Sequence, residues 1–283
     1  MSLAEIADPP PAAARPTLER VRGAARIAFN ADGGVTRLAE NFQSGSAKAR
    51  FPRSRPGEAP QVVLLNTAGG VTGGDRLSFA VSVGPHASGV ATTQAAERIY
   101  RRSDGVAHID TMLTVADGAS LDWLPQETIL FDRSALKRTL TADVHPTGRL
   151  LAVEAILLGR TAMGEQIRNA ALADSWRIRR GGKLAFADGL RFDGDSVAIL
   201  ANGATGGGAV AVATLVLIAP DAEAAIDTAR AALADARSEA GASAWNGILV
   251  ARLAAPDGQT LRADLIRLIE ALRGVTMPGN WLC

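Results

Sequence analysis

Cysteine is almost missing from this chain of 283 residues, since Cys283 is its only cysteine. A single thiol excludes an internal disulfide framework, and its place at the last residue argues against a cysteine nucleophile held beside a histidine. No apolar run reaches the roughly 18 residues that span a bilayer, and residues 209–219 read as a core strand. The formal net charge of +1 argues against a dedicated nucleic-acid binder. We therefore expect a soluble, cytoplasmic protein that binds neither membrane nor nucleic acid.

Signatures of catalysis and of resident metals are also missing. No Gly-x-Ser-x-Gly elbow precedes a helix, and no zinc-type spacing occurs. His86 and His145 stand beside prolines in turns, which indicates surface exposure. His108 and Asp110 are two residues apart on a predicted strand and so share one face. Because this pair lacks further ligands, a solvated strand face is favoured over a metal site.

Strand patterns dominate what is present. Hydrophobic residues make up 47% of the chain, enough for a large core. Apolar residues alternate over 107–115 and 120–124, residues 149–158 form a longer apolar run, and Gly/Pro turn signals separate these pieces. The pattern predicts a mainly β fold, either stacked or sandwiched, and of these we expect stacked, β-helix-like strands. We expect a disordered Ala/Pro-rich tail over residues 1–16 and a single large domain over 17–283.

Two amphipathic helices are predicted near the C-terminal end. In residues 221–240 the apolar side chains fall on one face, and Asp221 follows Pro220 as a cap. In residues 259–273 a leucine-rich stripe ends at Gly274. Each helix is expected to pack one face against the β-body.

A glycine-rich segment, residues 66–75, follows the apolar run 62–65 and ends at Asp75. It predicts a backbone-exposing turn in which backbone amides orient the Asp75 carboxylate. A phosphate-binding P-loop would need Lys-Ser or Lys-Thr after the last glycine, where this chain has Asp75-Arg76. A dinucleotide site would need a helix next, whereas residues 76–83 alternate like a strand. A tight β-connection is therefore favoured, and an enzyme that binds a phosphorylated ligand is the weaker alternative.

Several carboxylates stand in segments that are predicted to be buried. A buried carboxylate is unstable unless it is paired, hydrogen-bonded or metal-bound. Nearby arginines favour structural ion pairs on composition alone. The functional alternative is a polar path for a divalent cation, because oxygen ligands hold such ions weakly enough to release them. The carboxylates concerned are Asp75, Glu97, Glu127, Glu154, Glu165 and Asp188.

Four segments resemble, in order, the signature blocks of the urease accessory protein UreD family, also called UreH. They are NTAGGVTGGD at 66–75, TTQAAERIYR at 92–101, LDWLPQETILFD at 121–132 and LGRTAMGE at 158–165. The match extends from about residue 20 to the C-terminal helix. The resemblance implies a β-rich single-domain fold with two helices and a non-enzymatic role.

The resemblance also implies partners and a cargo. Family members bind UreF, which recruits the GTPase UreG, and the two-fold hetero-complex docks on apo-urease to install nickel. No tightly bound cofactor is implied, only transient passage of Ni²⁺. The family's tunnel positions fall on Asp75, Glu97, Glu154 and Asp188, so Asp75→Ala or Asp188→Ala should lower urease activation without loss of folding. The alternative is a pure docking module that never contacts nickel.

The C-terminal tail departs from the family pattern. Members often end in Leu-Pro-Arg-x-Trp, whereas this chain ends Met-Pro-Gly-Asn-Trp-Leu-Cys over residues 277–283. Loss of the arginine affects the expected local contacts of the tail but not the fold. The terminal thiol of Cys283 is interpreted as exposed and without a role.

Overall fold

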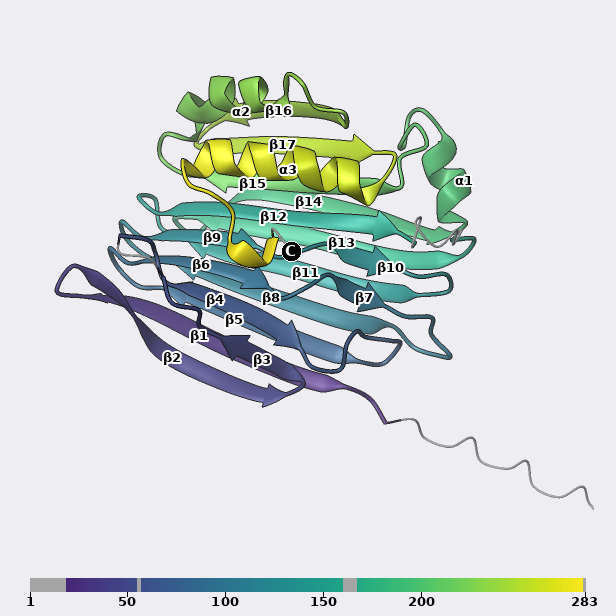
Figure 1. Ribbon diagram of the computed structural model, residues 1–283, viewed down its shortest axis with the longest axis horizontal. Helices are drawn as coiled ribbons and strands as arrows, with labels where there is room; N and C mark the ends of the chain where they lie inside the picture. Colours follow the sequence, from purple (N-terminus) through teal and green to yellow (C-terminus); the bar gives the residue numbers. More distant parts are fainter. Residues whose placement is uncertain (1–18, 55–56, 160–166, 282–283) are drawn as a thin grey trace, which may run out of the picture.

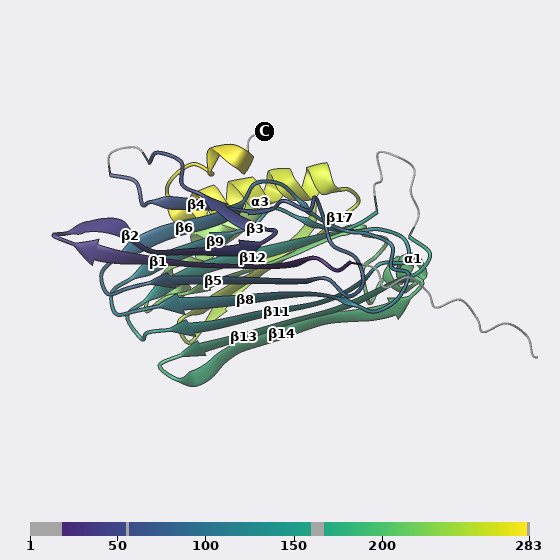
Figure 2. The ribbon, with the colours of Figure 1, turned by 90° about the horizontal axis from the view of Figure 1, so that it is seen from below.

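The computed structural model describes residues 19–54, 57–159 and 167–281. Two β-sheets lie face to face, and α3 (Gly258–Arg273) covers the outer side of the second sheet (Figures 1 and 2). The first sheet has the order β14 (Lys183–Gly194), β13 (Ala170–Arg180), β11 (Ala135–Val144), β8 (Ala107–Val115), β5 (Arg76–Val83), β1 (Arg22–Asp32), β2 (Val35–Gly45). The second has the order β16 (Glu239–Trp245), β17 (Ile248–Ala255), β15 (Ala211–Ile218), β12 (Arg149–Leu158), β9 (Ser120–Leu124), β6 (Ser88–Thr93), β4 (Gln61–Asn66), β3 (Ala47–Arg50).

The chain coils between the two sheets. After β5 in the first sheet it crosses to β6 in the second, returns to β8, and repeats this path through β9, β11, β12 and β13. Neighbouring strands within each series pair in parallel. Two short strands, β7 (Glu97–Ile99) and β10 (Thr128–Leu130), extend the coil on the second sheet, with Thr128 in register with Glu97 and Ile156. The predicted mainly β, β-helix-like fold is confirmed.

The strands bury their side chains in two layers. Between the sheets lie Leu113, Leu136 and Leu140, which alternate with more exposed residues as the sequence pattern predicts. Strand β12 is buried on both faces. Its Leu150 faces the first sheet, while Leu151 belongs to the second cluster, beneath the helices. Such double burial explains why residues 149–158 read as a continuous apolar run.

The helix predicted over 259–273 is confirmed as α3. The Asp257 carboxylate accepts a hydrogen bond from the Thr260 amide at its start, and Gly274 ends it with φ 68°. The carboxylate of Asp264, inside α3, accepts hydrogen bonds from the backbone amide and hydroxyl of Ser238. This contact links the helix to the chain that leads into edge strand β16.

The helix predicted over 221–240 is wrong in extent. The segment forms a 3₁₀ turn, η2 (Ala222–Ala225), and a short helix, α2 (Ile226–Leu233), before β16 begins at Glu239. Pairing with β17 and the Asp264 contact of Ser238 outweigh the local helix preference of an alanine-rich segment. A further short helix, α1 (Ser196–Ala201), was not predicted.

Some predictions fall outside the described residues, namely those on the tail over 1–16, on Glu165 and on Cys283. Of the helices that are described, none is both long enough and apolar enough to cross a membrane. The last described element, η3 (Gly279–Trp281), brings the C-terminal tail back against the second sheet.

Candidate functional site

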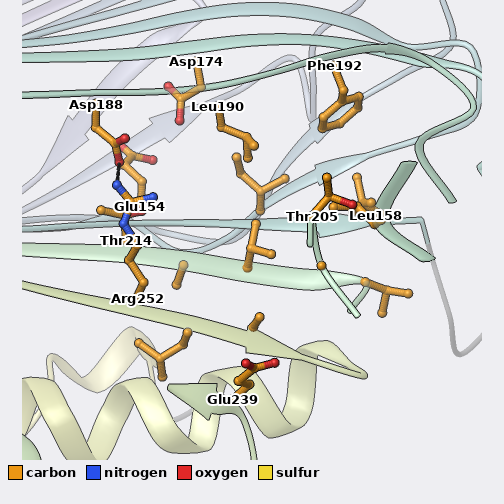
Figure 3. Close-up of a pocket in the computed structure, with 18 of the residues that line it drawn as sticks. Glu154, Leu158, Asp174, Asp188, Leu190, Phe192, Thr205, Thr214, Glu239 and Arg252 are labelled. Atoms are coloured by element: carbon orange, nitrogen blue, oxygen red, sulfur yellow. Dashed lines mark ion pairs between the residues drawn. The ribbon is translucent and has the colours of Figure 1, made fainter. Parts of the chain in front are cut away.

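Two cavities lie between the sheets. The larger has a volume of about 560 Å³ and the smaller about 270 Å³. Glu154 of β12 lines both, so this side chain lies between the two cavities. Polar residues of the larger cavity include Glu154, Asp174, Asp188, Thr214, Glu239 and Arg252 (Figure 3). Those of the smaller include Asn66, Glu97, Thr128, Arg138 and Glu154.

A buried ionic triad lies between the two cavities. Arg138 of β11 and Asp174 of β13 are register partners on adjacent parallel strands, and both are buried. The Arg138 guanidinium donates to Asp174 through Nε–Oδ1 at 3.1 Å and Nη2–Oδ2 at 2.7 Å. Its Nη1 donates to Glu154 Oε2, on the facing sheet, at 2.5 Å. The triad therefore joins the two sheets across the interior.

The electrostatics of the triad follow from its burial. Burial alone would lower the pKa of Arg138, but the charges of Glu154 and Asp174 raise it above its usual value, so the guanidinium stays charged. Burial raises the pKa of Glu154, against the opposing charge of Arg138. The indole Nε1 of Trp123 also donates to Glu154 Oε1 at 3.0 Å, and this bond favours the ionised form. The network is hydrogen-bonded throughout, as buried charges require.

Asp188 of β14 also lines the larger cavity, near Glu154 and Asp174 (Figure 3). Its Oδ2 is 2.8 Å from Nη2 of Arg252, the ion pair drawn in Figure 3. The Arg252 side chain is 62% exposed, so this pair borders solvent while the triad does not. An exposed partner is easily exchanged for water or an ion, which makes Asp188 more accessible to a ligand than Glu154.

Glu97 differs from Glu127, Glu154 and Asp188 because it has no arginine partner within ion-pair distance among the described residues. It is half-buried beside the smaller cavity, where Asn66 Nδ2 donates to its Oε1 at 3.1 Å. Burial raises the pKa of Glu97 to about 7, and the hydrogen bond from Asn66 only partly opposes this. A carboxylate that is half-ionised near neutral pH and borders a cavity is suited to exchange a proton for a passing cation.

The raised pKa of Glu97 predicts a pH-dependent stability. Its folded pKa of about 7 lies above the ordinary value of 4.5. Its favourable contribution is therefore complete below about pH 4.5 and is lost as the pH rises through 7. Glu97→Gln should raise the free energy of unfolding by about 1–2 kcal/mol at pH 8, with allowance for partial exposure, and should have little effect near pH 5. Urea unfolding across this range measures the difference, and a difference that does not change with pH would contradict the assignment.

Asp75 lines neither of these two cavities, although Asn66 and Gly69 of the same segment line the smaller one. Its carboxylate is buried and accepts backbone hydrogen bonds from Val21 and Thr72, each at 2.8 Å. The prediction that backbone amides orient Asp75 is confirmed. Asp75→Ala would leave both amides without this acceptor. We therefore expect this variant to disturb the conformation of the glycine-rich segment, whether or not a nickel path passes there.

The glycine-rich segment connects β4 to β5, as predicted for a tight β-connection. Its glycines permit close packing against residues 98–105. A Cβ atom on Gly73 would lie 1.9 Å from the Asp104 carbonyl oxygen, and one on Gly70 would lie 2.4 Å from the Tyr100 ring. These positions explain the glycines without a phosphate ligand.

The remaining acids and histidines have ordinary surroundings. Both carboxylate oxygens of Glu127 accept from Arg262 Nη1, at 2.7 and 2.8 Å. Glu127 is thus one of the structural ion pairs that composition favours. Asp110 is exposed and His108 half-buried on the outer face of β8, as predicted. Within the described part of the chain, no three His, Cys, Asp or Glu side chains cluster as they would around a metal ion.

Sequence reasoning named Glu97, Glu154 and Asp188 but missed Arg138 and Asp174. A signal for Arg138 existed, because it occupies an inward position between Leu136 and Leu140 in an alternating strand. A charge at such a position indicates a buried partner. The partner itself could not be inferred, since Asp174 is distant in sequence and meets Arg138 only through the coil.

Comparisons with known proteins agree over nearly the whole chain. The family model described as UreD urease accessory protein matches residues 21–280. The chain is 49% identical over 278 residues to "Urease accessory protein UreD" of Xanthobacter autotrophicus, covering 97% of this chain and 95% of that protein. It is 45% identical over 269 residues to the protein of the same description from Azorhizobium caulinodans, with coverage of 95% and 99%. The corresponding protein of Rhizobium rhizogenes is 47% identical over 271 residues, with coverage of 95% and 98%.

Proposed function

Because the chain belongs to the UreD urease accessory protein family, we propose that it is a urease maturation factor that conducts nickel through the space between its two sheets. Family members are accessory proteins and not enzymes, in keeping with the role inferred from sequence. In this proposal the chain works in the cytoplasm and binds UreF, and UreF recruits the GTPase UreG. The assembly docks on apo-urease as a two-fold hetero-complex.

The observation that carries the proposal is the succession of carboxylates along two adjoining cavities. Glu97 borders the smaller cavity, Glu154 lines both, and Asp188 borders the larger. Oxygen donors of this kind hold a borderline divalent ion loosely. A series of carboxylates, none of which belongs to a complete coordination site, would let Ni²⁺ pass from one to the next and then release it.

The alternative is a docking module that makes no contact with nickel. One observation favours it, namely that Glu154 and Asp188 already pair with Arg138 and Arg252. Glu97 distinguishes the two functions because it has a raised pKa and no paired arginine in the described structure. If nickel follows the cavities, Glu97→Gln should reduce urease activation while the complex still assembles. A pure docking module should tolerate the change.

The test is co-purification of the chain with UreF and UreG from its own organism, followed by activation of apo-urease with and without the chain. We expect a stable complex and activation that depends on the chain. Glu97→Gln is compared with Asp110→Asn, a change of the same kind on the outer face of β8. Failure to bind folded UreF would overturn the proposed function, and full activation by a Glu97→Gln complex would favour the docking module.

A further inference from the structure

The guanidinium of Arg138 occupies a position that resembles a cation site. It lies between the two cavities, and every side chain that accepts its hydrogen bonds does so through oxygen. We propose that Arg138 is a built-in cation that blocks a latent divalent-metal site formed by Glu154, Asp174 and Thr128. For its biological meaning the inference rests on the proposed nickel path, but its test measures metal binding by this chain.

The oxygen donors come from three different strands. Asp174 of β13 supplies two oxygens, Glu154 of β12 supplies Oε2, and Thr128 of β10 supplies Oγ1 at 2.9 Å from Nη1 of Arg138. Two carboxylates and a hydroxyl are an oxygen set suited to a hard or borderline divalent cation. The adjoining cavities leave room for water to complete the coordination of such an ion.

Charge decides whether this site can be filled. With Arg138 present, its guanidinium holds the oxygens of Glu154 on one side and of Asp174 on the other. A divalent ion would have to approach a fixed positive charge in a poorly solvated interior, where repulsion between like charges is strong. Without the guanidinium, two buried carboxylates would remain unpaired, and that arrangement is unstable unless a cation replaces it.

The arrangement is consistent with a path that must not retain its cargo. Glu154 and Asp174 are both less than a tenth exposed, and metal bound by such a pair would leave slowly. Arg138 keeps these carboxylates occupied, so the ion meets Glu97 and Asp188 as its more accessible ligands. Arg138 is thus a positioning residue that prevents tight binding of nickel at the most buried part of the path.

The experiment removes the Arg138 guanidinium in two variants. One keeps the carboxylates of Glu154 and Asp174, and the other replaces them with amides. Full-length chain carrying Arg138→Met is purified with UreF, incubated with Ni²⁺, passed through gel filtration and analysed for bound nickel. The matched control carries Arg138→Met, Glu154→Gln and Asp174→Asn together, which removes every charge of the triad while keeping similar volumes. The wild-type complex sets the background from the partner protein.

We expect the Arg138→Met complex to retain about one nickel ion more per chain than wild type, and the triple variant to retain no more than wild type. Nickel should also raise the melting temperature of the single variant selectively. Equal nickel retention by the folded single variant and wild type would overturn the inference.

Without metal the single variant is expected to be unstable, because its two buried acids are unpaired. It is therefore also expressed and refolded with and without Ni²⁺. Recovery of the folded chain by nickel supports the latent site, and no recovery overturns it. The refolding readout uses neither UreF nor urease activation, so failure of this inference is distinguishable from failure of the proposed function, which appears as failure to bind UreF or as activation that does not depend on the chain.

Discussion

Trp281→Ala is expected to lower the free energy of unfolding by about 3–5 kcal/mol. The Trp281 side chain is 1% exposed. Its indole Nε1 donates to the Leu124 carbonyl at 3.0 Å and to Thr92 Oγ1 at 3.2 Å, both on the second sheet. The Arg262 guanidinium of α3 lies 4.8 Å from the ring centroid and donates to the Trp281 carbonyl at 2.8 Å. Truncation removes a large buried ring together with the two hydrogen bonds that its indole donates.

Urea unfolding of the full chain measures this effect. Trp245→Ala is the matched control, since Trp245 lies on edge strand β16 and is 42% exposed. This control substitution should lower the free energy of unfolding by less than about 1 kcal/mol. Equal losses in the two variants would show that the tail is not anchored through Trp281.

The anchoring of Trp281 also shows how the C-terminal tail is held without the arginine that the family resemblance led us to expect there. Asn280 donates from Nδ2 to Thr92 Oγ1 at 3.1 Å, and its carbonyl accepts from Gln126 Nε2 at 2.9 Å. Arg262 supplies the guanidinium from α3 instead of from the tail. The expected change in local contacts therefore leaves the tail closely packed.

The strands were predictable where their pattern is local. Residues 107–115, 120–124 and 149–158 read as strands, and each coincides with a strand of the structure. The parallel pairing between them is non-local and could not be inferred from alternation. The predicted helix over 221–240 was wrong in extent because α2 ends at Leu233 and the last two residues of the segment, Glu239 and Ala240, pair with β17, a tertiary contact that outweighs local preference.

The candidate site was predictable in its acids but not in their partners. Glu154 was identifiable from sequence because a carboxylate within an apolar strand needs polar or charged partners that offset its loss of hydration. Arg138 and Trp123, which supply it, come from neighbouring turns of the coil. Asp188 and Arg252 are likewise distant in sequence. Which cavity-lining acid lacks an arginine partner is a property of the fold, so the surroundings of Glu97 could not be derived from sequence.

Filling the larger cavity is expected to have the largest effect on function. Thr214 of β15 is the register partner of Glu154 and lines this cavity (Figure 3). It is half-buried and faces open space, so an indole at this position fits without displacing the core. The ring would occupy the space beside Glu154 that a hydrated ion needs. If nickel passes here, Thr214→Trp should reduce activation to near the level measured without the chain.

The most direct test compares Thr214→Trp with Thr214→Val. Valine has nearly the same volume as threonine, so this control leaves the cavity open. Each variant is assembled with UreF and UreG, its complex is verified by gel filtration, and the rate of activation of apo-urease by Ni²⁺ is measured. The account predicts equal assembly, activation near wild type for Thr214→Val, and almost none for Thr214→Trp. Full activation by an assembled Thr214→Trp complex would contradict passage of nickel between the sheets.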